Sequence, residues 1–314
     1  MGFSKGNRII KDMKVLLTGA FKYSPEQIKA IEDLGNEVLF LQYEKDTLPA
    51  PASEIDAAVC NGLFLHHKLE DFNSLKYIQL TSAGFDRVPL EEIKTRSIVI
   101  NNARGVYSIP MAEWAVGRIL EHYKHFGQFN ESQKNYTWLK DRGLKELNVT
   151  KTAIIGAGNI GQEVTKRLSA FGAKITGYDV FLGDRPFFDS VHHVDALLSE
   201  VHEYDIVVLT APLTDETKHM ISKPILEAMK RDAMLVNIAR GGLIDTAALI
   251  DVLTERKDLY AALDVFEEEP LAVDSPLWKL PNVAVSPHNS FVSNGNNERM
   301  FSVIYNNLKA YLKK

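Results

Sequence analysis

Several features that would assign this chain to common functional classes are missing from its sequence. Its 314 residues include a single cysteine, Cys60, which excludes an internal disulfide and a metal site built from several cysteines, and which suits a reducing compartment such as the cytoplasm. Its 36 Lys and Arg against 41 Asp and Glu leave a net charge of −5, without the basic excess that electrostatic binding to nucleic acid or an anionic membrane requires. No run approaches the roughly 18 uncharged apolar residues of a membrane span. We therefore expect a cytoplasmic protein that binds neither nucleic acid nor a membrane.

The order of the apolar runs predicts two α/β domains, and at roughly 150 residues per domain the length suits two. Short β-rich runs alternate with helical patterns along the chain, which predicts parallel sheets covered by helices. Five runs in the first region suggest a flavodoxin-like unit; they are VLLT (15–18), EVLFL (37–41), AAVC (57–60), YIQL (77–80) and SIVI (97–100). Six runs in the second region match a doubly wound dinucleotide-binding domain; they are 153–156, 174–179, 205–210, 233–239, 260–265 and 283–287.

Three further segments have patterns of their own. A helical pattern runs from Ser108 to about Asn130, interrupted only by glycines, and is followed by a polar stretch in which we expect Trp138 and Leu144 to act as anchors. Residues 296–313 predict one amphipathic helix. Residues 1–12 are polar, and we expect an N-terminal extension ahead of the first strand.

A glycine-rich element follows the first strand of the second region. Gly156, Gly158 and Gly161 form a GxGxxG motif between a strand and a helix, with Asn159 and Ile160 inside it. In this context the glycines allow a tight turn, a close approach to a pyrophosphate and close packing of helix on strand. Asp179 ends the next strand, where a carboxylate accepts hydrogen bonds from a ribose 2′-OH and repels a 2′-phosphate. The motif predicts NAD as cofactor; a packing turn is the alternative, and the nearby Arg185 could accept a 2′-phosphate.

Other polar residues directly follow strands of the same predicted sheet. Thr210, Arg240, Asp264 and His288 each follow a different strand, and Glu269 lies just beyond Asp264. Ligands of an open parallel sheet bind outside the carboxyl ends of its strands, so we expect these residues to face one crevice. Taken singly, an Arg, Glu or His in such a place is more often part of a surface ion pair, and Asp264 could be a strand-end cap.

With these motifs in order, the chain resembles the D-isomer-specific 2-hydroxyacid dehydrogenases. The resemblance rests on GAGNIG, LTAPLTDETKHMI, NIARGGLIDTAAL, ALDVFEEEPL and SPH, and it covers residues 13–314. It implies two doubly wound parallel-sheet domains. A Rossmann NAD-binding domain (103–289) would be inserted into a flavodoxin-like substrate domain made of residues 13–102 and 290–314.

The resemblance also implies an activity, namely D-stereospecific hydride transfer between NAD(H) and a small 2-keto or 2-hydroxy acid. The catalytic residues would be Arg240, Glu269 and His288. Arg240 offers a planar fork for the substrate carboxylate and carbonyl, His288 can donate the proton, and Glu269 would favour the imidazolium and orient its ring. A homodimer is expected as well.

The resemblance extends to binding residues. The turn at Ser82, Ala83 and Gly84 would bind the substrate carboxylate together with Arg240 and His288, although a plain tight turn explains it equally well. The cofactor residues would be Gly156, Gly158, Asn159, Ile160, Gly161, Asp179, Thr210, Ala211, Pro212, Thr217, Ala239, Arg240, Asp264 and His288.

Some points stay open at this stage. Many relatives have glycine within two residues of the histidine, where this chain has Ser290 and Phe291, two side chains that could reshape the substrate pocket. Glyoxylate, hydroxypyruvate, pyruvate and branched keto acids all remain candidate substrates. The His66-His67 and His192-His193 pairs lack a third ligand in register, so no metal is expected. An NAD-sensing binding protein of the corepressor type, with the same fold, is the alternative function.

Overall fold

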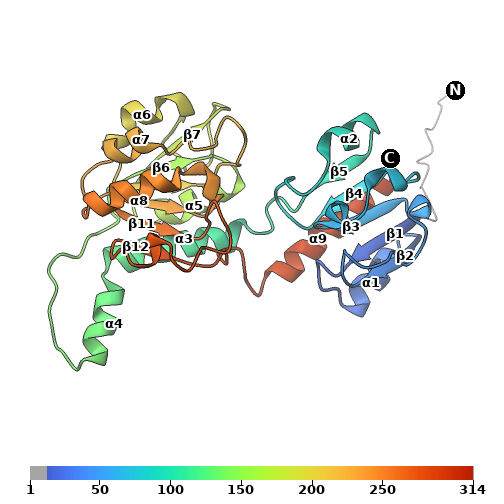
Figure 1. Ribbon diagram of the computed structural model, residues 1–314, viewed down its shortest axis with the longest axis horizontal. Coiled ribbons are helices and arrows are strands. Elements are labelled where there is room, and N and C mark those ends of the chain that lie inside the picture. The colour runs from blue at the N-terminus through green and yellow to red at the C-terminus, as the bar shows by residue number, and fades with distance from the viewer. Residues whose placement is uncertain (1–12, 314) are drawn as a thin grey trace. The chain divides into compact units, whose positions relative to one another are not determined.

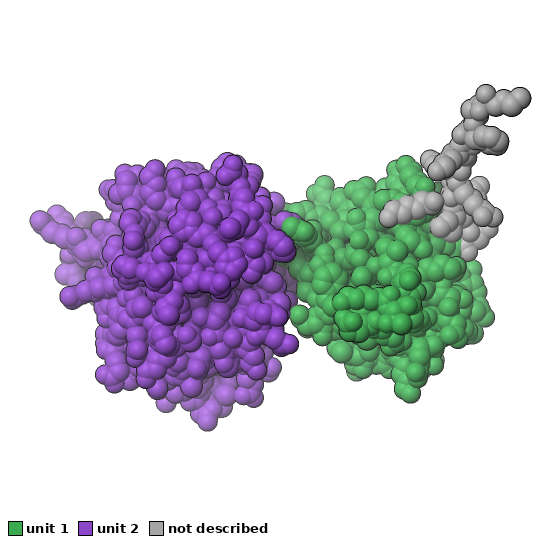
Figure 2. Space-filling model, turned by 90° about the horizontal axis from the view of Figure 1, so that it is seen from above, with its two compact units in different colours: residues 1–107, 293–314 green, residues 108–292 purple. Residues whose placement is uncertain are grey.

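The computed structural model describes residues 13–313, in which the chain forms two units (Figures 1 and 2). Unit 1 combines Met1–Tyr107 with Ser293–Lys314, and unit 2 is Ser108–Val292, inserted between them. The boundaries expected at residues 102 and 289 lie a few residues before the observed ones. The expected N-terminal extension, residues 1–12, lies outside the described residues.

Unit 1 contains a five-stranded parallel sheet with the strand order β2-β1-β3-β4-β5. Its strands are β1 (Met13–Thr18), β2 (Asn36–Leu41), β3 (Ala57–Cys60), β4 (Tyr77–Leu80) and β5 (Val99–Asn101). This order is that of a flavodoxin-like sheet, and it confirms the expected architecture.

The described residues of unit 1 form three α-helices: α1 (Pro25–Glu32), α2 (Leu90–Thr95) and α9 (Asn296–Leu312). Ser24 caps α1 and exchanges hydrogen bonds with Gln27, as a capping box does. The C-terminal helix α9 buries its apolar face against β1, β3 and β4, through Met300, Ile304, Leu308 and Leu312. The amphipathic pattern at the end of the chain therefore supplies one layer of this unit.

Unit 2 contains a seven-stranded parallel sheet with the order β12-β11-β10-β9-β6-β7-β8. Its strands are β6 (Lys151–Ile155), β7 (Lys174–Asp179), β8 (Ser190–His193), β9 (Ile206–Leu209), β10 (Met234–Asn237), β11 (Tyr260–Leu263) and β12 (Val283–Val285). The sequence predicted six strands, and this was wrong because the edge strand β8 was missed. Its sequence, SVHH, is short and polar, and an edge strand on a parallel sheet does not need the apolar run of a buried one.

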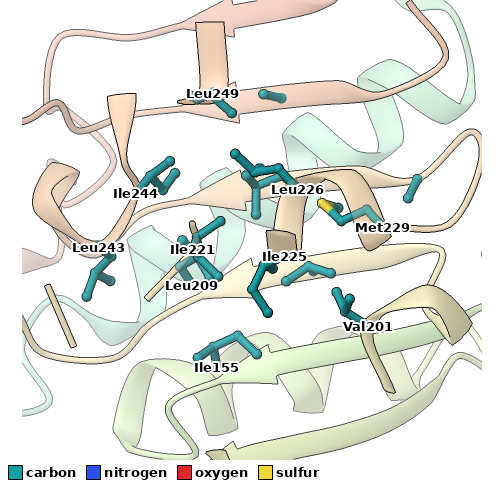
Figure 3. Packing of buried hydrophobic residues seen from close by; sticks show 14 of the residues in the cluster. Ile155, Val201, Leu209, Ile221, Ile225, Leu226, Met229, Leu243, Ile244 and Leu249 are labelled. Carbon is teal, nitrogen blue, oxygen red and sulfur yellow. The ribbon is translucent and has the colours of Figure 1, made fainter. Parts of the chain in front are cut away.

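Helices cover both faces of this sheet; they are α3 (Ser108–Tyr123), α5 (Asn159–Ser169), α6 (Leu197–Glu200), α7 (Lys223–Ala228) and α8 (Thr246–Glu255). A further helix, α4 (Phe126–Lys134), follows α3 and buries no residue. The strand order reverses between β6 and β9, so right-handed crossovers place α5 on one face and α7 and α8 on the other. Figure 3 shows Ile225 and Leu226 of α7 among side chains of the core, near Leu209 of β9. This core holds the strand ends that carry the candidate site.

The segment after α3 departs from the sequence expectation. The predicted continuous helix is two helices, because His125 adopts a left-handed conformation (φ 51°) and its Nδ1 contacts Oδ2 of Asp141 at 2.6 Å. From this break α4 and the loop after it project away from the rest of unit 2 (Figure 1). Trp138, expected as an anchor, is 93% exposed, because no element of its own unit covers the projecting segment.

Among residues 13–313, no helix combines the length and the apolar content that crossing a membrane requires.

Candidate active site

The glycine motif forms a tight turn between β6 and α5. Gly156 has φ +101°, and a Cβ there would lie 2.6 Å from the Ala211 amide nitrogen. A Cβ on Gly161 would lie 2.3 Å from the Gly156 carbonyl oxygen, so this glycine lets α5 pack closely on the turn. At Gly158, the N-cap of α5, a Cβ would meet nothing within 4 Å, which leaves open space in front of the helix N-terminus. That arrangement fits a dinucleotide pyrophosphate.

Asp179, at the end of β7, is held beside the glycine turn. Its Oδ2 accepts a hydrogen bond from the Ala157 amide at 2.9 Å, and its Oδ1 accepts one from the Phe181 amide at 3.0 Å. The carboxylate remains half-buried, so it keeps a side toward solvent. An acidic group in this place fits a ribose with a free 2′-OH. The Nη2 of Arg185 donates to the Phe181 carbonyl at 3.2 Å.

The loop after β9 lies against the same turn. The hydroxyl of Thr210 donates to the Gly156 carbonyl at 2.6 Å, and Ala211 is buried against Gly156. The hydroxyl of Thr217 donates to the Pro212 carbonyl at 2.7 Å and closes the loop. These expected cofactor residues therefore shape one wall of the glycine turn, and both threonine hydroxyls contact backbone.

Arg240 occupies a turn that follows β10. Asn237, buried at the end of the strand, accepts from the Ala239 amide at 3.0 Å and donates to the Arg240 carbonyl at 2.9 Å. The Nη1 of Arg240 donates to the Ala239 carbonyl at 2.8 Å, and the side chain is half-buried. The guanidinium is thus carried by a backbone that a buried amide holds in place.

Asp264, directly after β11, holds the loop that carries His288. It is fully buried and accepts three hydrogen bonds, from the Ser286 hydroxyl, the Asn289 amide (2.9 Å) and the Ser290 amide (2.9 Å). Its own carbonyl accepts from the His288 amide at 2.8 Å. The carboxylate therefore accepts hydrogen bonds from residues on both sides of His288 in the chain. His288 itself has an unusual positive φ of 50°.

Glu269 and His288 form a direct pair at the carboxyl edge of the sheet. The Nδ1 of His288 lies 2.8 Å from Oε2 of Glu269, and Oε1 of Glu269 accepts from the Phe266 amide at 3.0 Å. Because Nδ1 is engaged, Nε2 is the ring nitrogen that can reach a substrate oxygen. A carboxylate on one imidazole nitrogen and an open position on the other is the arrangement of a general acid and base.

The two residues that depart from relatives lie beside this pair. Ser290 is 3% exposed, and its amide is the one that bonds Asp264. The Phe291 ring stands edge-on to the His288 ring, with centroids 5.8 Å apart and planes at 90°. Phe291 therefore contacts the candidate proton donor directly, whereas Ser290 helps to hold the His288 loop through its hydrogen bond to Asp264.

In unit 1, Ser82, Ala83 and Gly84 form a turn at the carboxyl end of β4. The Ser82 hydroxyl donates to the Gly84 carbonyl at 2.9 Å, and the Asn102 side chain donates to the Ala83 carbonyl at 2.5 Å. Tyr107 donates its hydroxyl to the Thr81 carbonyl at 2.6 Å, so it packs on the strand end. The turn carbonyls are used internally, which favours presentation of the amide N–H groups.

The histidine pairs that suggested a metal have other contacts. His192 lies 2.8 Å from Glu200, and His67 contacts the Glu44 carbonyl at 2.9 Å. In the described part of the chain, no group of three or more His, Cys, Asp or Glu side chains could hold a metal ion.

Sequence reasoning missed Ser286, which donates to Asp264, and a second histidine–glutamate pair, His219 with Glu267. Both lie inside the motifs that carried the resemblance, SPH, KHMI and EEEP. A search for polar residues flanking each candidate would have singled them out.

Comparison with known proteins gives concordant matches. The family model for the NAD binding domain of D-isomer specific 2-hydroxyacid dehydrogenases matches residues 116–290. The D-3-phosphoglycerate dehydrogenase of Methanocaldococcus jannaschii is 35% identical over 282 residues, 88% of this chain and 53% of that protein, so the chain spans about half its length. The hydroxypyruvate reductase of Thermotoga maritima is 36% identical over 259 residues, 80% of this chain and 83% of that protein. The crystal structure of D-lactate dehydrogenase from Aquifex aeolicus, complexed with NAD and lactic acid, has a TM-score of 0.75 and 26% identity, covering 95% of each chain.

Proposed function

The chain belongs to the D-isomer-specific 2-hydroxyacid dehydrogenase family, and from this premise we propose that it interconverts a small 2-keto acid and the D-2-hydroxy acid. The observation that carries the proposal is the 2.8 Å contact between His288 and Glu269 at the carboxyl edge of the dinucleotide-binding sheet. A glycine turn that fits a pyrophosphate lies at the same edge, at the point where the strand order reverses.

The protein residues divide the work of reduction among them. Arg240 binds the substrate carboxylate and holds the carbonyl oxygen with its planar, permanently charged fork. His288 donates a proton from Nε2 to that oxygen as it becomes a hydroxyl, and takes it back in the oxidative direction. Glu269 orients the imidazole through Nδ1 and favours its protonated form.

The cofactor is a nicotinamide dinucleotide, which supplies or accepts the hydride when bound. We propose that this chain uses NAD in preference to NADP, because Asp179 lies at the ribose end of the glycine turn. A 2′-phosphate there would meet a carboxylate that two backbone amides already hold in place.

The substrate is proposed by class only. Similar proteins include a hydroxypyruvate reductase, a glyoxylate reductase and a D-lactate dehydrogenase in complex with lactic acid, and these names refer to small acids with oxygen on carbon 2. Because the Phe291 ring lies beside the His288 ring, we expect it to limit the size of the substrate side chain. Candidate substrates should therefore differ in the size of that side chain.

Turnover of a keto-acid panel tests the proposal. Purified protein is incubated with NADH and glyoxylate, pyruvate, hydroxypyruvate or branched keto acids, and the product configuration is determined. Consumption of NADH with formation of the D-hydroxy acid is expected, and it should vanish in His288→Asn. Binding of NADH without turnover of any keto acid would refute the proposal and favour the NAD-sensing alternative.

We also propose that the protein forms a homodimer through α4 and the segment after it. This arm carries apolar side chains that its own unit leaves uncovered: Phe126 (51% exposed), Tyr136 (99%), Trp138 (93%) and Leu139 (58%). A second copy of the chain presents the same apolar surface, so pairing would bury both. Sedimentation should give about twice the 35.2 kDa chain mass, and Trp138→Asp should weaken the dimer. A wild-type monomer at micromolar concentration would contradict this assignment.

A further inference from the structure

A second histidine–glutamate pair lies next to the catalytic loops. Glu267 precedes Glu269 by two residues, and its Oε1 is 2.5 Å from Nε2 of His219. Its other oxygen, Oε2, accepts from the Thr246 amide, the first residue of α8, at 3.0 Å. One carboxylate thus joins three segments, namely the loops after β9 and β11 and the start of α8.

Two of these segments, the loops after β9 and β11, also contact the turn that carries Arg240. The backbone at Phe266 and Glu267 lies directly on Gly241, where a Cβ would be 1.8 Å from the Phe266 carbonyl carbon. The His219 amide donates to the Gly242 carbonyl at 2.8 Å. His219 and Glu267 therefore contact each other and also the two residues that directly follow Arg240.

The electrostatics favour an ionised Glu267 carboxylate that links His219 and Thr246. Partial burial alone would raise the pKa of Glu267, but the hydrogen bonds from Thr246 and His219 outweigh it, so its pKa lies below the usual value. The carboxylate is therefore ionised at neutral pH and accepts from both partners. Both side chains of the pair keep substantial exposure, so the contact adds little to global stability.

We propose that Glu267 and His219 are positioning residues that hold the Arg240 turn and the Glu269 loop at the spacing catalysis requires. This inference rests on the proposed function of Arg240 and Glu269. Glu267 acts on Glu269 through two peptide units, and Glu269 in turn orients His288. Displacement of a catalytic group by about 1 Å is enough to lower a rate about a hundredfold.

A double-mutant cycle tests the pair. The variants are Glu267→Ala, His219→Ala and both together, with Glu268→Ala, the exposed neighbour, as the matched control. Each single variant should lower kcat/KM about tenfold to a hundredfold while the NADH dissociation constant stays within about threefold. The double variant should be no worse than the poorer single one, because both residues act through one contact. Glu267→Gln, whose amide can bond Thr246 and a neutral His219, should recover most of the activity.

Hydrogen exchange supplies a readout that does not depend on turnover. In Glu267→Ala, peptides covering residues 264–270 should exchange faster than in wild type, and in Glu268→Ala they should not. If wild type turns over no keto acid, the proposed function fails, and the exchange experiment still decides whether Glu267 holds the loop. Unchanged exchange, wild-type kcat/KM in Glu267→Ala, or additive losses in the cycle would each overturn the inference.

Discussion

Replacing Asp264 by asparagine should disturb both the stability of the protein and the placement of His288. The carboxylate is fully buried, and each of its oxygens faces a backbone amide, Oδ1 the Asn289 N–H and Oδ2 the Ser290 N–H. Whichever way the new amide is turned, its NH2 group meets one of these donors. At least one of these N–H groups, the buried one of Ser290 or the part-buried one of Asn289, is then left without an acceptor.

The magnitude follows from that single orphaned donor. A buried donor without a partner costs about 1–3 kcal/mol, and the two remaining bonds lose the assistance of the charge. We expect the free energy of unfolding to fall by about 2–3 kcal/mol, which at about 2–4 °C per kcal/mol lowers Tm by about 4–12 °C. Because the turn from Ser286 to Ser290 carries His288, kcat/KM should fall by up to about a hundredfold.

Thermal unfolding and steady-state kinetics check this prediction. Ser286→Ala removes only the hydroxyl donor and should cost about 1 kcal/mol. Asp274→Asn, an exposed site, controls for the change of charge. An Asp264→Asn protein with wild-type Tm and wild-type kcat/KM would refute the reasoning, because the carboxylate would then not hold the His288 turn.

Three further predictions address the cofactor, the substrate clamp and pH. Arg240→Lys should lower kcat/KM about a hundredfold or more with NADH affinity retained, since ammonium cannot reproduce the two-pronged clamp; wild-type efficiency would contradict the assignment. Asp179→Asn should reduce the preference for NADH over NADPH about tenfold or more in kcat/KM, and an unchanged ratio would mean that another group discriminates. Burial lowers the pKa of His122 to about 4, so between about pH 6.5 and 4 the unfolded chain binds a proton that the folded one does not, and stability falls as the pH drops. His122→Phe keeps the stacking on Tyr260 (centroids 4.0 Å) and should flatten the fall of Tm over that range, whereas an equal slope would contradict this cause.

The parts of the fold that depend on local constraints could be predicted from the sequence. The glycine turn is one, because Gly156 and Gly161 face backbone atoms at distances that exclude a Cβ. The apolar stripe of α9 is another, since its spacing alone defines a buried face. The strand ends likewise indicated which residues share an edge, and Glu269 and His288 do meet there.

What could not be predicted depends on tertiary partners. The break before α4 arises at His125, whose left-handed backbone is accompanied by a contact with Asp141 from beyond the helix. The edge strand β8 has no apolar run to mark it. Asp264 was expected as a cofactor residue or a strand cap, but its three donors come from a turn some twenty residues later, which no local pattern brings to it.

The most direct test of the central claim is the pH dependence of kcat/KM in both directions for wild type and Glu269→Gln. Reduction requires the protonated His288 and oxidation the neutral one, and the glutamine keeps a hydrogen bond to Nδ1 while removing the charge that favours the imidazolium. We predict that the alkaline limb of reduction and the acidic limb of oxidation both move to lower pH in Glu269→Gln. Profiles that stay in place would show that Glu269 does not support proton transfer by His288, and would contradict the account.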